Sequence, residues 1–278
     1  MNAKDETNLS WAFLTDVGLK RASNEDSGLI LTLNLDVVGE HSTLGLFVVS
    51  DGMGGKERGE LASKIAVKTL GEAFVDSFLR ASLRRVAEIA NYGERLESAE
   101  AEVLSSPATF LINAIQQANQ RIGRLRRNGQ PVKAGATVTA GIITDDLLTL
   151  GHVGDCRAYL LYEGHLRQLT QDHNVVNEMV KKGILSREES HEHPQRSILS
   201  RALGSQESVE VDTSVTVLQS GCKILLCTDG LHSMVSEEDL VHVLSRPDHP
   251  KITTGELVNL ANQAGGKDNI TVLVISFL

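Results

Sequence analysis

The sequence of 278 residues has few cysteines, no long apolar run and no excess of basic residues. None of its apolar stretches approaches the roughly 20 residues that a helix needs to cross a bilayer. Residues 1–7 contain no apolar core, which argues against a signal peptide. The three cysteines, Cys156, Cys222 and Cys227, are odd in number and show no zinc-binding spacing. They are typical of small buried residues in a reducing compartment, so a cytoplasmic protein without membrane attachment is predicted.

The charge balance limits the partners that the chain can bind. A formal net charge of −9 disfavours binding to DNA or RNA, because neutralising nucleic-acid phosphates needs a basic face. The same charge disfavours attraction to an anionic membrane surface. If the substrate is anionic, the site must supply its own positive charge through metal ions and a few arginines.

Length, composition and patterning predict one domain of mixed structure. With 41% hydrophobic residues and no Pro/Ser-rich linker, residues 10–278 fit a single domain after a tail of residues 1–9. Apolar runs predict strands at residues 11–16, 29–35, 44–49, 137–143, 147–152, 158–162, 166–169, 213–218, 223–227 and 270–275. Helical periodicity and capping signals predict helices over 61–78, 106–125, 175–182, 236–244 and 254–264. Strand runs with helix pairs between them predict an α+β sandwich of antiparallel sheets covered by helices.

Two segments stand apart from this regular pattern. Residues 80–104 are charged and helix-prone, and they are predicted to extend the first long helix into solvent. Residues 172–200 are polar and irregular apart from one short helix. The chain shows no internal repeat and no low-complexity tract.

Four aspartates stand in short tags that contain Gly or Asn and are spread over most of the chain. They are Asp51 before Gly52, Asp155 after Gly154, Asp229 before Gly230 and Asp268 before Asn269. All but Asp155 adjoin apolar runs that predict buried strands. A carboxylate at the end of a buried strand is costly unless something compensates its charge. The pattern therefore indicates strands that converge on hard cations.

The ligand chemistry of these tags favours magnesium or manganese. Carboxylates, backbone carbonyls and water suit Mg²⁺ and Mn²⁺, whereas zinc usually recruits His or Cys. Two such ions could share Asp51 and a bridging hydroxide that attacks phosphorus in line. Gly52 has no side chain, so its carbonyl can turn toward a metal without a clash. Each Asp-Gly pair alone would be interpreted as a hairpin turn, but all the tags together favour a metal-dependent hydrolase.

The motifs also resemble those of a known family. The segments Arg21–Asp26 and Asp51–Gly55 resemble the opening of the metal-dependent PP2C-type (PPM) serine/threonine phosphatases, in their bacterial form. Later segments match the family's remaining motifs in order: Gly135–Thr137, Gly154–Tyr159, Leu169–His173, Arg201–Gly204, Leu226–Leu231 and Lys267–Thr271. The match covers roughly residues 10–277, and motifs spaced over that length form a specific signal. The resemblance implies a central β-sandwich of two antiparallel sheets flanked by helices, with a flap over residues 172–200.

The resemblance implies two core metal ions, Mn²⁺ or Mg²⁺, and a possible third. Asp51 would bridge the two core ions. Gly52, through its carbonyl, and Asp229 would complete one of them, and Asp268 would hold the other. Asp155 matches the family position that helps to bind the third, weaker ion. From the residues alone, Asp155 could instead cap a turn or pair with Arg157.

Three residues near the first tag would complete the site. The resemblance implies that Glu25 and Asp26 act through metal-bound waters, and that Arg21 grips the substrate phosphate. A planar, permanently charged guanidinium suits that role because it binds two phosphate oxygens at once. From the residues alone, Arg21 could instead be a surface arginine, and Glu25 and Asp26 could cap local backbone.

One position departs from the family pattern. Eukaryotic members carry a histidine, thought to protonate the leaving group, where this chain has Met53. Methionine cannot donate that proton, so water or another group would serve. His152 and His173 are predicted to be structural, and Cys156 is predicted to be a small buried residue rather than a nucleophile.

The sequence thus predicts an enzyme, a cytoplasmic bacterial-type PP2C phosphatase that hydrolyses phosphoserine and phosphothreonine on proteins. The bridging hydroxide would attack directly, without a phosphoenzyme. Phosphorylated proteins would be its substrates and a Ser/Thr kinase its natural partner, by analogy with the family. Two alternatives stay open: a catalytically inactive phosphoprotein-binding module on the same fold, and a phosphatase of small phosphoesters.

Overall fold

The computed structural model describes residues 9–37, 40–54, 58–90, 106–127, 130–131, 133–186, 189 and 193–278. Two five-stranded sheets, in which every pairing is antiparallel, form the centre of the fold. One sheet has the order β1 (Leu9–Asp16), β14 (Ile270–Phe277), β13 (Lys223–Cys227), β10 (Arg157–Tyr162), β11 (His165–Gln168). The other has the order β12 (Asp212–Val217), β9 (Leu147–Val153), β8 (Val138–Thr144), β3 (Glu40–Ser50), β2 (Ser27–Val37).

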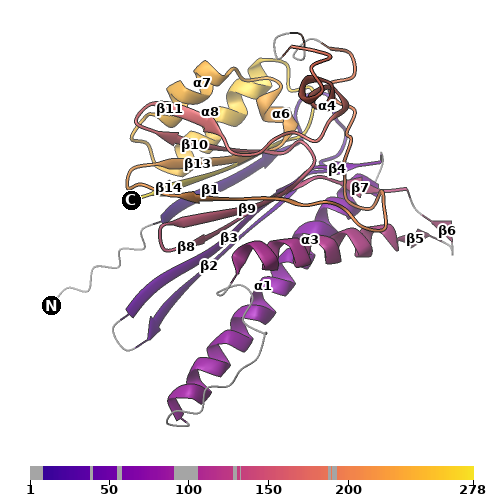
Figure 1. Ribbon diagram of the computed structural model, residues 1–278. Coiled ribbons are helices and arrows are strands. Elements are labelled where there is room, and N and C mark those ends of the chain that lie inside the picture. Colours follow the sequence, from indigo (N-terminus) through magenta and orange to yellow (C-terminus); the bar gives the residue numbers. More distant parts are fainter. Residues whose placement is uncertain are drawn as a thin grey trace.

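The sheets stack face to face, and helices cover the outer face of each (Figure 1). The long helices α1 (Arg58–Ala90) and α3 (Pro107–Gly123) lie on the sheet that contains β3. The sheet that contains β13 is covered by α6 (Asp229–His232), α7 (Glu237–Leu244) and α8 (Pro250–Gln263). This arrangement confirms the predicted α+β sandwich. None of the described helices has the length and apolarity to cross a membrane.

Three apolar clusters hold these layers together. Between the sheets, alternate residues such as Phe47, Ile224 and Ile275 meet in a fully buried core. The residues that point the other way, such as Leu46 and Leu225, pack under the covering helices. This alternation is the two-residue period expected of strands that are buried on both faces.

The start of α3 shows how local sequence sets an element. The Ser106 hydroxyl accepts a hydrogen bond from the Thr109 N–H at 3.3 Å, and Pro107 occupies the first helical turn. Both features match the predicted cap. The buried stripe of the helix also matches the predicted one from Phe110 to Ile122, and it packs against α1 and the β8–β9 sheet.

Some element bounds differ from the sequence prediction. Helix α8 starts at Pro250 rather than at Thr254, because the His249 side chain accepts from the Lys251 N–H and Pro250 begins the first turn. Helix α1 continues to Ala90, as the predicted helical extension of residues 80–104 requires, and residues 91–105 lie outside the described part.

Several very short elements were not predicted. The two-stranded ribbons β4 (Gly52–Met53) with β7 (Gly135–Ala136), and β5 (Arg126–Arg127) with β6 (Gln130–Pro131), are too short to show a period. The segment predicted as a flap contains α4 (Val175–Lys181), which Asn174 caps by accepting from the Asn177 N–H.

The register of the sheets brings the four predicted tags to one end of the sandwich. Asp16 at the end of β1 pairs with Ile270 at the start of β14, and Cys227 at the end of β13 pairs with Val272. In the other sheet, the end of β3 lies beside the start of β8, which pairs with the end of β9. The tags that follow β3, β9 and β13 and precede β14 therefore share the end at which α6, β4 and β7 lie in Figure 1.

The core predicts a measurable difference between two isoleucines on α3. Ile115 is fully buried, whereas Ile112 is 37% exposed on the same helix. Replacing Ile115 with Ala should lower the unfolding free energy by about 2–5 kcal/mol, because the substitution leaves a cavity. Ile112→Ala should change the unfolding free energy by about 0.5 kcal/mol or less. Urea unfolding of both variants checks this expectation, and equal losses would contradict the assigned core.

Candidate metal centre

Asp51 lies directly after β3, where its backbone is held on both sides. Its N–H donates to the Thr137 hydroxyl at 3.1 Å, and its carbonyl accepts from the Thr137 N–H at 2.8 Å. The Ser50 hydroxyl donates to the Thr137 carbonyl at 2.6 Å. The predicted motif Gly135–Thr137 therefore acts on the site by fixing the backbone of Asp51.

The other three tagged aspartates come to the same place from different elements. Asp229 is the first residue of α6, directly after β13, and Asp268 precedes β14. Asp155 follows β9 after Gly154, whose φ of 110° and contact with Thr137 suit only glycine. The Asp155 carbonyl lies 3.0 Å from Nε2 of His232, a half-buried histidine whose pKa is lowered to about 3 by desolvation.

These carboxylates share a crowded, poorly solvated space. Desolvation, followed by the charges of Asp26, Asp229 and Asp155, raises the pKa of Asp51 well above its ordinary value. Desolvation and then the charge of Asp268 raise the pKa of Asp229 to about 6. Desolvation and then the charge of Asp229 raise the pKa of Asp155 to about 8. Desolvation together with repulsion between neighbouring carboxylates marks a site that lacks positive charge.

The residues fit a divalent cation. The Asp51 and Asp229 carboxyl groups are close enough for each to influence the pKa of the other. Oδ1 of Asp229 is buried without a hydrogen-bond partner among the described residues. No trio of Asp, Glu, His or Cys side chains in the described part of the chain forms a ligand set on its own, so an ion here also needs backbone carbonyls and water.

Gly52 sits where a side chain has no room. A Cβ on Gly52 would lie 2.0 Å from the Gly59 carbonyl oxygen, at the start of α1. The Gly52 N–H donates to the Glu25 carbonyl at 3.1 Å, and the Glu25 carboxylate lies against Gly59. The start of α1, the Gly52 backbone and Glu25 are therefore packed together, and a carboxylate is favourable at a helix N-terminus.

Arg21 is paired with one of the predicted ligands. Its Nη2 donates to Oδ2 of Asp268 at 2.5 Å, with the two side chains 54% and 32% exposed. This contact places Arg21 at the mouth of the site rather than on an unrelated surface. The structure thus brings together Arg21, Glu25, Asp26, Asp51, Gly52, Asp155, Asp229 and Asp268, as the sequence predicts.

Asp26 is buried, and it contacts a neighbouring strand rather than local backbone. Its carboxylate accepts from the Thr228 hydroxyl at 2.8 Å, directly before Asp229. Desolvation raises its pKa to about 7. The local capping is done instead by Asn24, which accepts from the Asp26 N–H at 3.0 Å.

Asn269 is an organising residue to which the sequence reading gave no role. Its side chain donates to the carbonyls of Val17 and Ser23, both at 2.9 Å, and accepts from the Glu25 N–H at 2.8 Å. One side chain therefore orders the loop that carries Arg21 and Glu25. In the sequence, the feature that could have pointed to Asn269 is its position directly after Asp268 in the last motif.

The alternative pairing of Asp155 with Arg157 is not what the structure shows. Arg157 makes a bidentate ion pair with Asp172, at 2.9 Å from Nε to Oδ1 and 2.7 Å from Nη2 to Oδ2. This pair is mostly buried and ties the start of the 172–200 segment to β10. A cleft of about 1070 Å³ opens beside it, reaching from Asp155 and Asp229 to α4 and the start of α7.

The other candidate groups are structural, as predicted. His152 and His173 are buried with ring centroids 4.7 Å apart. His152 contacts the Thr139 hydroxyl through Nδ1, and Nδ1 of His173 accepts from the Gly154 N–H. Burial raises the pKa of the Cys156 thiol well above its ordinary value, so it is no thiolate nucleophile.

Comparison with known proteins decides the family. The family model of protein phosphatase 2C matches residues 30–259. The serine/threonine phosphatase Stp of Listeria monocytogenes is 34% identical over 264 residues, which cover 95% of this chain and 94% of that protein. The chain belongs to the protein phosphatase 2C family.

Solved structures of this family agree. The serine/threonine phosphatase PstP/Ppp of Mycobacterium tuberculosis has 31% identity and a TM-score of 0.75, covering 97% of this chain and 98% of that one. The catalytic domain of the phosphatase PstP in complex with two manganese ions has 30% identity and a TM-score of 0.73, covering 96% and 97%. Membership of this family makes the chain an enzyme, a phosphoprotein phosphatase. The alternative of a catalytically inactive binding module is not favoured.

The raised pKa values predict how metal-free protein responds to pH. The pKa of an aspartate in the unfolded chain is near 4. When the pKa is higher in the folded state, the acid contributes its full stabilisation at pH values below the unfolded pKa. That stabilisation is lost as the pH rises through the folded pKa. For Asp26 and Asp155 those folded values are about 7 and about 8. In EDTA, the urea midpoint should therefore fall between about pH 7 and 8.5, where the buried histidines are neutral in both states.

Two controls sharpen this pH experiment. Asp155→Asn should flatten the upper part of the profile, because it removes the group that titrates near pH 8. Saturating Mn²⁺ should reduce the fall in the wild-type protein, because a bound cation compensates the carboxylate charges. A midpoint in EDTA that does not fall over this range would contradict the repulsion described here.

Proposed function

We propose that this enzyme hydrolyses phosphoserine and phosphothreonine on proteins with the help of bound Mn²⁺ or Mg²⁺. Two core ions are held by Asp51, Gly52, Asp229 and Asp268. A third ion is bound more weakly, with the help of Asp155. The observation that carries the assignment is the gathering of buried carboxylates from distant tags, where desolvation and neighbouring charge raise the pKa values of Asp51, Asp155 and Asp229. The manganese ions of the related PstP structure support the choice of ion.

The chemistry divides between the ions and the chain. When bound, the ions lower the pKa of water to give the attacking nucleophile and neutralise charge on the phosphoryl oxygens. The protein positions the ligands through rigid backbone. Strand β3 and Thr137 hold the backbone of Asp51, and β13 leads directly to Asp229. Glu25 and Asp26 lie near the same carboxylates and would accept hydrogen bonds from water bound there.

Arg21 is the phosphate-binding side chain in this proposal. Its guanidinium already binds a carboxylate oxygen of Asp268, and a phosphate offers oxygens of similar geometry. If Asp268 held a cation, its carboxylate would bind Arg21 less tightly, and the guanidinium would be available to the substrate phosphate. Met53 supplies no proton in this scheme, so the leaving serine or threonine oxygen takes its proton from water.

The cleft beside the metal centre supports a protein substrate. It runs past Asp155 and Asp229 to Arg196 and Glu237, side chains of opposite charge that a peptide substrate can contact. A small phosphoester would leave most of this space unused. We further propose that residues 10–278 act as one domain in the cytoplasm and reverse the marks of a Ser/Thr kinase.

Metal dependence and the role of Asp229 are tested together. Hydrolysis of a phosphothreonine peptide should vanish in EDTA and return when Mn²⁺ or Mg²⁺ is added. Asp229→Ala should abolish the Mn²⁺-dependent rate while the far-ultraviolet circular dichroism stays native. Glu238→Ala, an exposed acid on α7, is the matched control and should keep wild-type turnover. Activity that survives full chelation, or in Asp229→Ala, would remove the proposed centre.

Arg21 predicts a separate effect on substrate affinity. Arg21→Ala should raise KM for the phosphopeptide about 10- to 100-fold, the loss of a charge-assisted hydrogen bond of about 1.5–3 kcal/mol. Lys20→Ala, one residue earlier in the same exposed turn, is the control for net charge. Steady-state kinetics at saturating Mn²⁺ measure both, and an unchanged KM in Arg21→Ala would show that this arginine does not bind phosphate.

A further inference from the structure

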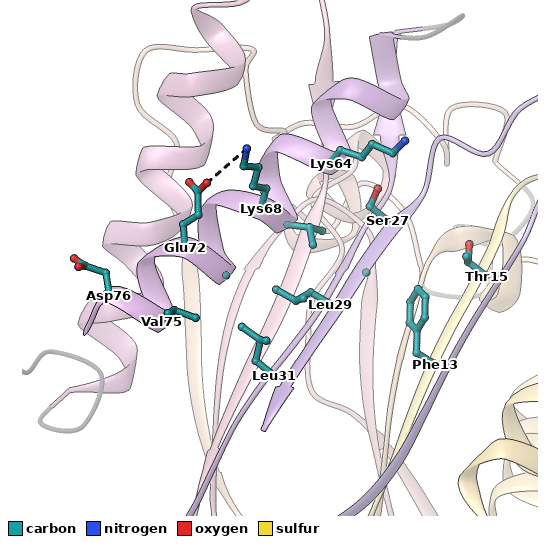
Figure 2. A pocket seen from close by; sticks show the side chains of 13 residues that line it. Phe13, Thr15, Ser27, Leu29, Leu31, Lys64, Lys68, Glu72, Val75 and Asp76 are labelled. Atoms are coloured by element: carbon teal, nitrogen blue, oxygen red, sulfur yellow. Dashed lines mark ion pairs between the residues drawn. The ribbon is translucent and has the colours of Figure 1, made fainter. Parts of the chain in front are cut away.

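A second hollow lies on the face of the molecule that carries α1, away from the metal centre. This groove has a volume of about 850 Å³ and runs between β1, β2 and α1 (Figure 2). Phe13 stands on one side, Leu29 and Leu31 form the floor, and Val67 and Val75 line the helix side. Val75 is 41% exposed, so the groove presents apolar side chains to water.

The floor of the groove is the edge of a sheet. In the described residues β2 pairs only with β3, so its other side carries no further strand. The strand spans Ser27–Val37 and contains no Lys or Pro, the residues that commonly protect an edge from association. A long sheet edge without Lys or Pro, beside the exposed Val75 and the partly buried Leu29 and Leu31, is typical of an interaction surface.

Charged side chains follow α1 along the upper rim of this groove. Lys64 and Lys68 come first, and Glu72 and Asp76 follow at the same four-residue spacing, so all four lie on one stripe of the helix (Figure 2). All four are exposed. The stripe is therefore positive at one end and negative at the other, with its midpoint near residue 70.

Three of these charged side chains, Lys64, Lys68 and Glu72, are engaged in exposed ion pairs that can exchange partners easily. Lys64 contacts Glu60 at 2.6 Å, Lys68 contacts Glu72 at 3.7 Å, and Glu72 contacts Arg121 at 2.6 Å. Pairs of this kind contribute little in water and can re-form with another surface.

We propose that a second copy of this chain docks on the groove, with the two α1 helices antiparallel about a two-fold axis near residue 70. That axis places Lys64 opposite the partner's Asp76 and Lys68 opposite the partner's Glu72. The reverse contacts form at the other end, so the surface complements itself. The centres of the positive and negative pairs are about 12 Å apart along the helix, a spacing that the reversed partner repeats.

The order of the charges favours a second copy over an unrelated protein. A two-fold interface uses the same patch on both chains, so each residue must meet its complement when the direction is reversed. Lys64, Lys68, Glu72 and Asp76 meet that requirement with both pairs. The partly buried Leu29 and Leu31 and the exposed Val75 lie beside this stripe and become covered in the same contact.

Charge reversal tests the proposal on the full-length chain. Analytical ultracentrifugation of the wild-type protein should give the mass of a dimer that dissociates on dilution. K64E/K68E should be monomeric under the same conditions, and so should E72K/D76K, because each variant opposes like charges at both ends of the interface. Each dissociation constant should rise at least about tenfold. An equimolar mixture of the two variants should recover the dimer mass, because only the mixed pair is complementary.

Controls separate this surface from net charge and folding. K182E/K251E makes the same change in net charge as K64E/K68E on other parts of the surface, and it should leave the dimer intact. Circular dichroism and phosphopeptide turnover should be native in all variants, because none of these residues lies in the metal centre.

The proposal is overturned by any of three results. Wild-type protein that stays monomeric at high concentration would leave the groove to another occupant, such as an extended peptide from another protein. A dimer that persists in both reversed variants would lie on another surface. A mixture that fails to dimerise would show that these charges do not pair across an interface.

Discussion

The structure depends on the electrostatic cost of placing several carboxylates at one end of a closely packed sandwich. Asp26, Asp51, Asp155 and Asp229 repel one another in a space from which most water is excluded, and their pKa values rise for that reason. Within the described residues, Arg21 is the cation that directly contacts this group, through Asp268. A folded protein keeps such an arrangement when a bound cation compensates it, which is the link between this fold and phosphoryl transfer.

Backbone rigidity makes that compensation specific. Ions held by carboxylates and carbonyls need those oxygens to stay in place without side-chain help from histidine or cysteine. Here Thr137 fixes the backbone of Asp51, Thr228 anchors Asp26 beside Asp229, and Asn269 orders the loop of Arg21. Helix α1 begins against Glu25 and continues away from the site to the groove, so both proposed surfaces share one rigid helix.

Much of the fold and the list of acidic ligands could be predicted, because both are indicated by patterns within short stretches of sequence. Strand and helix periods, the Ser106–Pro107 cap and the Asp-Gly tags are visible within a few residues. The remainder depends on contacts between distant segments. Nothing near Arg157 in sequence indicates that its partner is Asp172, and nothing near Arg21 indicates Asp268. The ribbon of β4 with β7 is two residues long on each side, so it exists only because Gly135–Thr137 and Asp51 meet in three dimensions.

Crystals of the enzyme grown with Mn²⁺ test the central claim most directly. Anomalous diffraction should show two strong manganese peaks at the end of the sandwich, with Asp51 between them, Asp229 on one ion and Asp268 on the other. The Arg21–Asp268 contact should then be longer than the 2.5 Å found here. A fully soaked crystal with no anomalous peak among these carboxylates would contradict the account.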